Sequence, residues 1–272
     1  MKYLSASPAV TSILCLVTVI AFAACRTTVP ETGRKQLNML SPSKEAALGL
    51  SEFQKIRKEK KISQNAAYNA TAQRVGKRLS VVMPGPHAEW EFVVFDDPIP
   101  NAFALPGGKV GIHSGLFQIT KDDSGLAAVV GHEVAHVVAR HSGERLSQNA
   151  VAGMIVAGAG VALNRDGRDG AIPTAALGGA ALIATRSFSR KQELEADQLG
   201  ALFMARAGYD PRESIGLWQR FAQWRQQSGQ SGQSGQSKKT PAFLSTHPVD
   251  DRRIAELQAF MPRAMSEYKD GQ

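Results

Sequence analysis

The chain has 272 residues, of which 43% are apolar and 21% are charged, and it carries a net charge of +8. These proportions are ordinary for a globular protein. The length suits one domain with a sizeable hydrophobic core and is too short for a convincing second domain with a core of its own. A sequence pI near 9.6 would suit nucleic acid, but the export signal at the N-terminus leads us to expect no nucleic-acid partner.

Residues 1–24 have the pattern of a bacterial lipoprotein signal peptide. Lys2 gives a positive start, and residues 13–24 form an uncharged apolar stretch that is too short to span a membrane comfortably. Residues 22–25, Phe-Ala-Ala-Cys, are a lipobox, in which a signal peptidase cleaves before Cys25 and lipid modifies its thiol. A plain signal peptide without lipid stays open because Phe22 is a weaker choice than leucine in this motif.

The residue after the cysteine indicates the compartment. Bacterial lipoproteins retained at the inner membrane usually carry Asp there, whereas this chain has Arg26, which favours the outer membrane with the protein facing the periplasm. Cleavage would remove Cys15 and leave Cys25 acylated, so no internal disulfide is expected. Residues 25–34 are then the lipidated cysteine and a polar tether.

Residues 35–265 are expected to form one α+β domain that is mostly helical, with a small sheet beside its central helix. Alternation of apolar residues predicts strands, and apolar residues at helical spacing predict helices. In chain order we expect helices at 43–60 and 65–79, a strand around 90–94, and strands at 101–105 and 109–113 on either side of Pro106-Gly107-Gly108.

The run His-Glu-Val-Ala-His at residues 132–136 is the strongest indication in the sequence of the reaction that the protein catalyses. On a helix, His132 and His136 lie one turn apart on the same face, where two imidazoles can bind one Zn²⁺. Glu133 then lies beside the metal, where it can take a proton from a water molecule bound there. Asp123 or Ser124 can cap the start of this helix. The alternative is two hydrogen-bonded histidines in an ordinary buried helix.

A catalytic zinc needs a third protein ligand and one open position. In one large class of zinc peptidases, that ligand is a histidine six residues beyond the second, with a glycine between. Here the corresponding residues are Ser142 and Ala139, which excludes that arrangement. His141 is one residue out of register, and we expect it to cap or pack near the helix end.

Residues 190–200 offer the other solution, a glutamate from a second helix. Glu193 and Asp197 are one turn apart on one face, so Glu193 can bind the metal while Asp197 accepts the free ring N–H of a ligand histidine. Glu195 points elsewhere. Taken alone, this stretch would be interpreted as a charged helix face exposed to solvent.

The remaining segments carry weaker signals. The Ala/Gly-rich stretches 150–163 and 171–184 favour close helix packing over membrane insertion, with a mobile flap as a further alternative. A helix is expected from Pro211 to about residue 227. The Ser-Gly-Gln repeat at 228–238 predicts a flexible loop.

Four motifs together resemble a known family: Asn-Ala-Phe-x-x-Pro-Gly-Gly from Asn101, His-Glu-x-x-His, Glu-x-x-x-Asp, and Thr-His-Pro-x-x-x-x-Arg-Ile, which contains His247 and Arg253. They are similar to the HtpX-like and CAAX-prenyl-protease-like zinc metallopeptidases, in particular to soluble periplasmic lipoprotein members. The chain differs from the integral-membrane members in having no transmembrane helix expected in its mature part, so prenyl-protein substrates are not carried over.

The resemblance implies a zincin-like, gluzincin-type fold with one zinc per chain. It implies His132, His136 and Glu193 as zinc ligands and Glu133 as general base. Asp197 and Arg253 would support the ligands from behind. It also suggests an edge strand near Asn101 that can pair with extended substrate.

His247 is the candidate oxyanion donor, with Asn101 holding substrate or intermediate nearby. A fourth-ligand role for His247, which would make the enzyme latent, stays open, as does a purely structural role.

The expected function is therefore zinc-dependent cleavage of misfolded or unassembled envelope proteins by an enzyme held at the membrane through a lipid on Cys25. One alternative is a lipoprotein chaperone or assembly factor that keeps the peptidase fold but mainly binds. A second alternative is a structural lipoprotein in which zinc only stabilises the fold. The oligomeric state cannot be inferred from this chain.

Overall fold

The computed structural model describes residues 26–83, 88–163, 187–230, 242–248 and 250–268. Cys25 and the signal peptide lie outside the described residues, as do the second Ala/Gly-rich stretch and residues 231–241. Within the part of the chain that is described, no helix combines the length and the apolar character that crossing a membrane requires.

A three-stranded sheet lies beside the helices. It consists of β3 (Glu91–Phe95), β4 (Ala102–Leu105) and β5 (Lys109–His113), with β5 in the middle, parallel to β3 and antiparallel to β4. Gly107 and Gly108 adopt φ values of +87° and +85° in the tight turn from β4 to β5, a conformation that side chains with a Cβ rarely tolerate. The order β3-β5-β4 leaves β4 at the edge of the sheet, where the family resemblance led us to expect an edge strand.

The sheet separates two apolar clusters because successive side chains of a strand point to opposite faces. Phe92 and Val94 of β3 face the main core, whereas Phe95 packs with Phe53 and Leu105 in a smaller cluster on the other side. All five residues of β5 are buried, as expected of a central strand covered on both faces.

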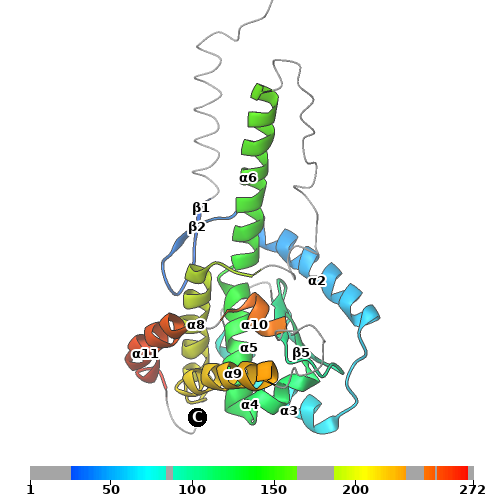
Figure 1. Ribbon diagram of the computed structural model, residues 1–272, viewed down its shortest axis with the longest axis vertical. Coiled ribbons are helices and arrows are strands. Elements are labelled where there is room, and N and C mark those ends of the chain that lie inside the picture. The colour runs from blue at the N-terminus through cyan, green and yellow to red at the C-terminus, as the bar shows by residue number, and fades with distance from the viewer. Residues whose placement is uncertain (1–25, 84–87, 164–186, 231–241, 249, 269–272) are drawn as a thin grey trace, which may run out of the picture.

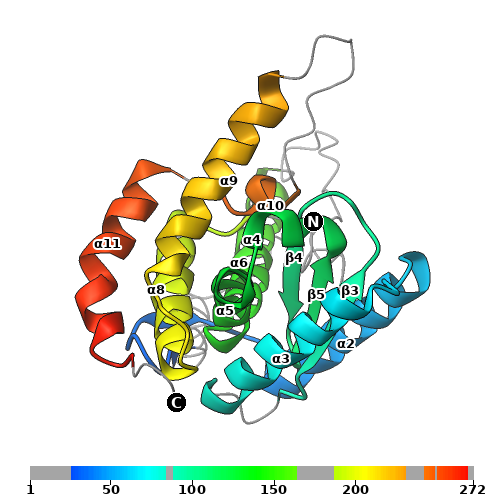
Figure 2. The same ribbon diagram turned by 90° about the horizontal axis from the view of Figure 1, so that it is seen from below.

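Two helices cover the sheet. Helix α2 (Pro42–Glu59) is capped by Ser41 and packs on β4 and β5, and α3 (Ala66–Val82) is capped by Asn65 and packs on β3. Both run alongside the strands in Figure 2. Their bounds differ from the predicted 43–60 and 65–79 by at most a few residues at the ends, where such predictions are least precise.

Helix α5 (Asp123–Val138) is the centre of the fold, preceded by η1 (Ser114–Leu116) and α4 (Phe117–Thr120). It packs against α8 (Arg190–Arg206), α9 (Glu213–Gln230), α3 and β4. Its cap is Asp122, whose side chain accepts from Gly125 N, and neither Asp123 nor Ser124. Because Asp122 has extended backbone angles and Asp123 is already helical, only Asp122 can reach that orphan N–H.

Helix α11 (Asp251–Met265) packs on α8 and follows the short α10 (Ala242–Thr246). Asp250 caps α11, so the helix begins three residues after Pro248. Together these elements confirm the predicted α+β architecture, mostly helical with small sheets.

Three segments differ from expectation. Residues expected as a polar tether form strand β1 (Arg26–Thr28) and a turn leading to β2 (Lys35–Leu37), which pairs antiparallel with β1. The first Ala/Gly-rich stretch continues α6 (His141–Leu163), which projects from the body of the molecule (Figure 1). Helix α9 continues through residues 228–230, which were expected to belong to the flexible loop.

Candidate metal centre and cleft

Helix α5 presents His132, Glu133 and His136 side by side, all at most 3% exposed. The Nε2 atoms of His132 and His136 lie 3.2 Å apart. From the first turn of α8, the Glu193 carboxylate approaches both, with Oε2 3.5 Å from His132 Nε2 and Oε1 3.6 Å from His136 Nε2. Two helices far apart in sequence thus bring the three residues expected as ligands together.

His247 joins this group from the end of α10. Its Nδ1 lies 3.0 Å from Glu193 Oε1 and 3.2 Å from His132 Nε2, and its Nε2 lies 3.2 Å from Glu133 Oε1. One potential ligand atom each from His132, His136, Glu193 and His247 falls within 4.8 Å of the others.

These separations suit a metal ion. Zinc–nitrogen and zinc–oxygen bonds of about 2.0–2.2 Å at a tetrahedral ion place neighbouring ligand atoms about 3.3–3.6 Å apart. Four of the separations between ligand atoms lie between 3.0 and 3.6 Å, and all of them lie within 4.8 Å. Imidazole and carboxylate are also the donor set that zinc accepts, so the buried group fits such an ion.

A chain of contacts supports His132 from behind. Its Nδ1 lies 2.9 Å from Asp197 Oδ1, and Arg253 donates to both oxygens of Asp197 at 2.8 and 2.9 Å. Arg253 also lies 2.9 Å from Glu193 Oε2 and stacks over the Trp218 ring at 4.4 Å. The arginine is 2% exposed, so it fixes two carboxylates at once inside the core.

His136 is held by different neighbours. The Phe188 ring stacks on its imidazole with a centroid separation of 3.8 Å. His141, the first residue of α6, lies behind it with Nδ1 2.9 Å from His136 Nδ1. His141 is therefore outside the ligand group and packs near the end of α5, where the sequence led us to expect it.

Burial and the dense charges shift the acidities of the metal-free group. Burial disfavours protonated His132, but hydrogen bonds to Asp197 and Glu193 raise its pKa to about 9. Burial lowers the pKa of His136 well below its usual value and raises that of Glu133. Burial also opposes ionised Glu193, yet the surrounding imidazoles hold the pKa of this carboxyl well below its usual range. The group therefore contains one carboxylate held charged beside another whose burial favours proton uptake.

A cleft of about 350 Å³ opens beside the metal group. It is lined by Glu133 and His247, by residues of β4, and by Asn101 and Phe188. Against the larger effect of burial, the Ala104 N–H of β4 is near enough to the Glu133 carboxylate to lower its pKa slightly. Asn101 thus lies along the cleft and outside the four-residue metal group, and its backbone carbonyl accepts from His113 N.

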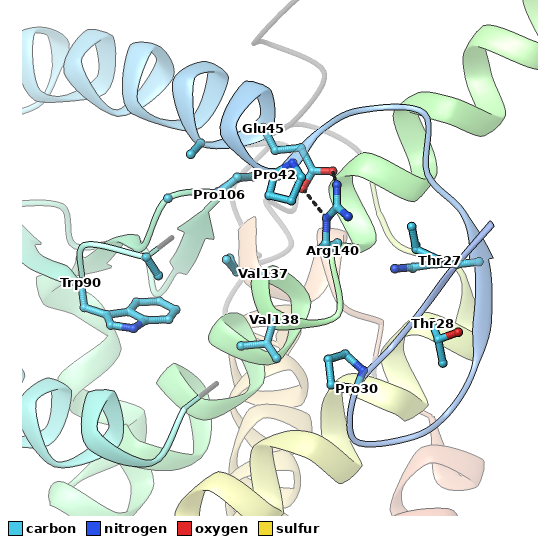
Figure 3. Close-up of a pocket in the computed structure, with 14 residues that line it drawn as sticks. Thr27, Thr28, Pro30, Pro42, Glu45, Trp90, Pro106, Val137, Val138 and Arg140 are labelled. Carbon is cyan, nitrogen blue, oxygen red and sulfur yellow. Dashed lines mark hydrogen bonds and ion pairs between the residues drawn. The ribbon is translucent and has the colours of Figure 1, made fainter. Parts of the chain in front are cut away.

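A second cavity of about 220 Å³ lies on the other side of the C-terminal end of α5 and contains no member of the metal group. Figure 3 shows the apolar side chains of Trp90, Val137 and Val138 around it, with the ion pair between Arg140 and Glu45 at its edge. Its lining is predominantly apolar, and it lacks the convergent titratable groups of the cleft.

Several neighbours of the site were not identified from the sequence. Phe188 precedes α8 without any motif, and Arg34 lies in the segment expected as a tether. Trp218 lies within the helix expected from Pro211 to about residue 227, where no motif marks it. No local pattern marks these residues, because their relevance arises from contacts between distant segments.

A His-x-x-x-His helix facing a glutamate from a second helix, beside a small mixed sheet, defines the class as a gluzincin-type metallopeptidase fold. The chain belongs to peptidase family M48, whose sequence profile matches residues 66–261. This confirms the family resemblance inferred from the four motifs.

Curated relatives agree with the family assignment. The chain is 34% identical over 87% of its length to the mitochondrial metalloendopeptidase OMA1 of Schizosaccharomyces pombe, and 38% identical over 66% to that of Saccharomyces cerevisiae. It is 28% identical over 87% to the beta-barrel assembly-enhancing protease of Escherichia coli. The chain spans 66%, 50% and 47% of the lengths of these three relatives, in that order.

Proposed function

We propose that this protein is a zinc-dependent endopeptidase of the bacterial envelope that cleaves misfolded or unassembled proteins. The observation that carries the proposal is the convergence of His132, His136 and Glu193 on one buried point with Glu133 beside it, at the end of an open cleft. Family membership supports peptide-bond hydrolysis as the reaction.

The residues have complementary roles in this reaction. The two histidines and Glu193 would hold a zinc ion, which would supply Lewis acidity to the substrate carbonyl and to a water molecule near pH 7. Glu133 takes the proton of the attacking water and passes it to the leaving amine. Burial raises the pKa of Glu133, which suits a carboxylate that must accept and then release a proton.

The edge strand β4 offers unpaired backbone groups to which an extended substrate can bind as an added strand. Just before β4, the Asn101 carbonyl faces β5, and alternation along the strand turns the backbone groups of Ala102 and Ala104 away from β5, toward the cleft. A peptide added to this edge by strand pairing would pass beside Glu133, because that carboxylate and the residues of β4 line the same cleft. Asn101 would hold the substrate where the strand begins.

Such docking favours unfolded substrates. Strand addition recognises a substrate through its backbone N–H and C=O groups, which every extended chain offers. In a folded protein these groups are already hydrogen-bonded to one another. This supports misfolded or unassembled proteins as the substrate class.

His247 has two roles that its contacts support. The 3.0–3.2 Å separations of Nδ1 from Glu193 and His132 suit a fourth ligand, which would give a latent enzyme. Withdrawn slightly into the cleft, the same imidazole would donate to the oxyanion formed at the substrate carbonyl.

The proposed location is the outer membrane, with the protein facing the periplasm and anchored by lipid on Cys25. The lipobox and Arg26 support this location. The name of the beta-barrel assembly-enhancing protease of Escherichia coli agrees with an envelope substrate, whereas the OMA1 relatives are named as mitochondrial.

The direct test compares cleavage of casein, an unfolded protein, by the purified chain and by its Glu133→Gln variant. Glutamine keeps the shape of the side chain but cannot accept the proton, so the variant should retain zinc and lose cleavage. Because His247 can hold the enzyme latent, each chain is also assayed with His247→Ala. If both chains bind casein equally and neither cleaves it in either background, the protein is a binding factor with a peptidase fold.

A further inference from the structure

A buried relay lies behind His136. The His141 ring is fully buried, with Nδ1 2.9 Å from His136 Nδ1 and Nε2 2.9 Å from Glu195 Oε2. Glu195 is on a different face of α8 from Glu193, as expected, but it is 5% exposed and reaches the metal group through His141. The sequence offered no role for this glutamate.

The relay dictates where the ring hydrogens lie. His136 directs Nε2 toward the metal group, so its remaining hydrogen is on Nδ1 and is donated to His141 Nδ1. Since His141 Nδ1 then acts as acceptor, its own hydrogen is on Nε2 and is donated to Glu195. Glu195 thereby fixes the tautomer of two successive imidazoles, as Asp197 does for the single imidazole of His132.

The far end of the relay is anchored by the N-terminal hairpin. Arg34 Nε donates to Glu195 Oε2 at 2.6 Å, and the Thr32 hydroxyl donates to Oε1 of the same carboxylate. The other nitrogens of Arg34 donate to Glu144 in the first turn of α6 at 2.8 and 2.9 Å. The Arg34 side chain is only 12% exposed. The hairpin is therefore tied to both helices that carry the relay.

We infer that His141 and Glu195, anchored by Arg34, are positioning residues that orient His136 for metal binding, so that the hairpin of β1 and β2 is part of the metal centre. This inference rests on the zinc site proposed above. It gives the N-terminal segment a role beyond linking the domain to an anchor. It also gives Glu195, which the sequence only placed away from the metal, an indirect role in zinc binding.

The test measures the zinc dissociation constant of the full chain by competition with a chelator, together with the visible absorption spectrum of the cobalt-substituted protein. His141→Phe keeps a ring but leaves the His136 N–H without an acceptor, so zinc binding should weaken about 10–100-fold. His141→Asn offers an oxygen near the position of Nδ1 and should recover most of the affinity. Glu195→Gln should weaken binding less than His141→Phe, because a neutral acceptor remains.

A matched control separates positioning from stability. Glu267→Gln removes the charge from a similar contact between arginine and glutamate, to Arg206 at the opposite end of α8, and should leave zinc affinity and the cobalt spectrum unchanged. If His141→Phe and Glu195→Gln lower only the melting temperature, with zinc affinity equal to the parent, the relay is structural and the inference fails. If the parent itself binds no zinc, the proposed function fails first.

Discussion

The close crossing of α5 and α8 gives a quantitative prediction. Glu193, Asp197 and Gly200 recur at a helical spacing of four and three, so they share the face of α8 that meets α5. A Cβ added at Gly200 would lie 2.9 Å from the backbone nitrogen of His132, and ordinary van der Waals contact begins at 3.4 Å. Gly200→Ala must therefore push the two helices apart by about 0.5 Å at this point.

That displacement is large compared with the tolerance of metal–ligand distances, but it costs the fold only a modest amount of free energy. Metal–ligand distances tolerate about ±0.2 Å, so a shift of Glu193 and Asp197 relative to His132 should weaken zinc binding about tenfold or more. Overpacking costs about 1–3 kcal/mol, and alanine regains about 1 kcal/mol over glycine in a helix. The net loss of folding free energy is then no more than about 2 kcal/mol.

The assays are chelator competition for zinc affinity and thermal unfolding of the metal-free chain. A loss of that size lowers the melting temperature of a domain this long by up to about 8 °C. Gly216→Ala in α9 is the matched control, because the nearest atoms to its added Cβ are the ends of the Arg220 and Glu213 side chains at 3.3 Å, which can move aside. It should be neutral or stabilising and leave zinc affinity unchanged. If Gly200→Ala behaves like Gly216→Ala in both assays, the crossing does not set the ligand geometry.

Three further predictions concern the site itself. His132→Ala, His136→Ala and Glu193→Ala should each lower zinc content in elemental analysis, and full occupancy in Glu193→Ala would mean that the third ligand is another residue. Asp197→Ala should weaken zinc binding by about 10–100-fold in chelator competition, because the His132 imidazole loses its orienting carboxylate; an unchanged affinity would remove Asp197 from the site. His247→Ala should cleave casein faster, or digest itself, if the fourth-ligand role dominates, and should lose about 10²–10³ in kcat if oxyanion donation dominates. Unchanged rate and zinc affinity would leave His247 a structural residue.

Local patterns in the sequence were sufficient for the elements that carry the chemistry. The strands on either side of Gly107 and Gly108 were predicted because apolar alternation and turn glycines act over a few residues. The helix containing His132 was predicted from apolar residues at helical spacing, although its cap is Asp122, one residue before the first of the two predicted positions, Asp123 and Ser124. The pairing of this helix with Glu193 came from motif spacing and family resemblance.

The support around the ligands could not be predicted in this way. Arg34 contacts Glu195 across 161 residues of sequence, and Gln36 donates to the Ala139 carbonyl across 103. Such contacts depend on how whole elements pack, and polar residues in a segment without periodicity look the same whether they are solvated or buried. The hairpin was therefore interpreted as a tether.

Stepwise return of zinc to the metal-stripped chain, with casein cleavage measured at each ratio of zinc to protein, tests the central claim most directly. The account predicts no cleavage without metal and a rate that rises linearly to a plateau at one zinc per chain, in the parent or, if His247 holds it latent, in His247→Ala. Cleavage by the metal-free chain at the plateau rate, or none at any zinc ratio in either chain, would contradict a zinc peptidase built on His132, His136 and Glu193.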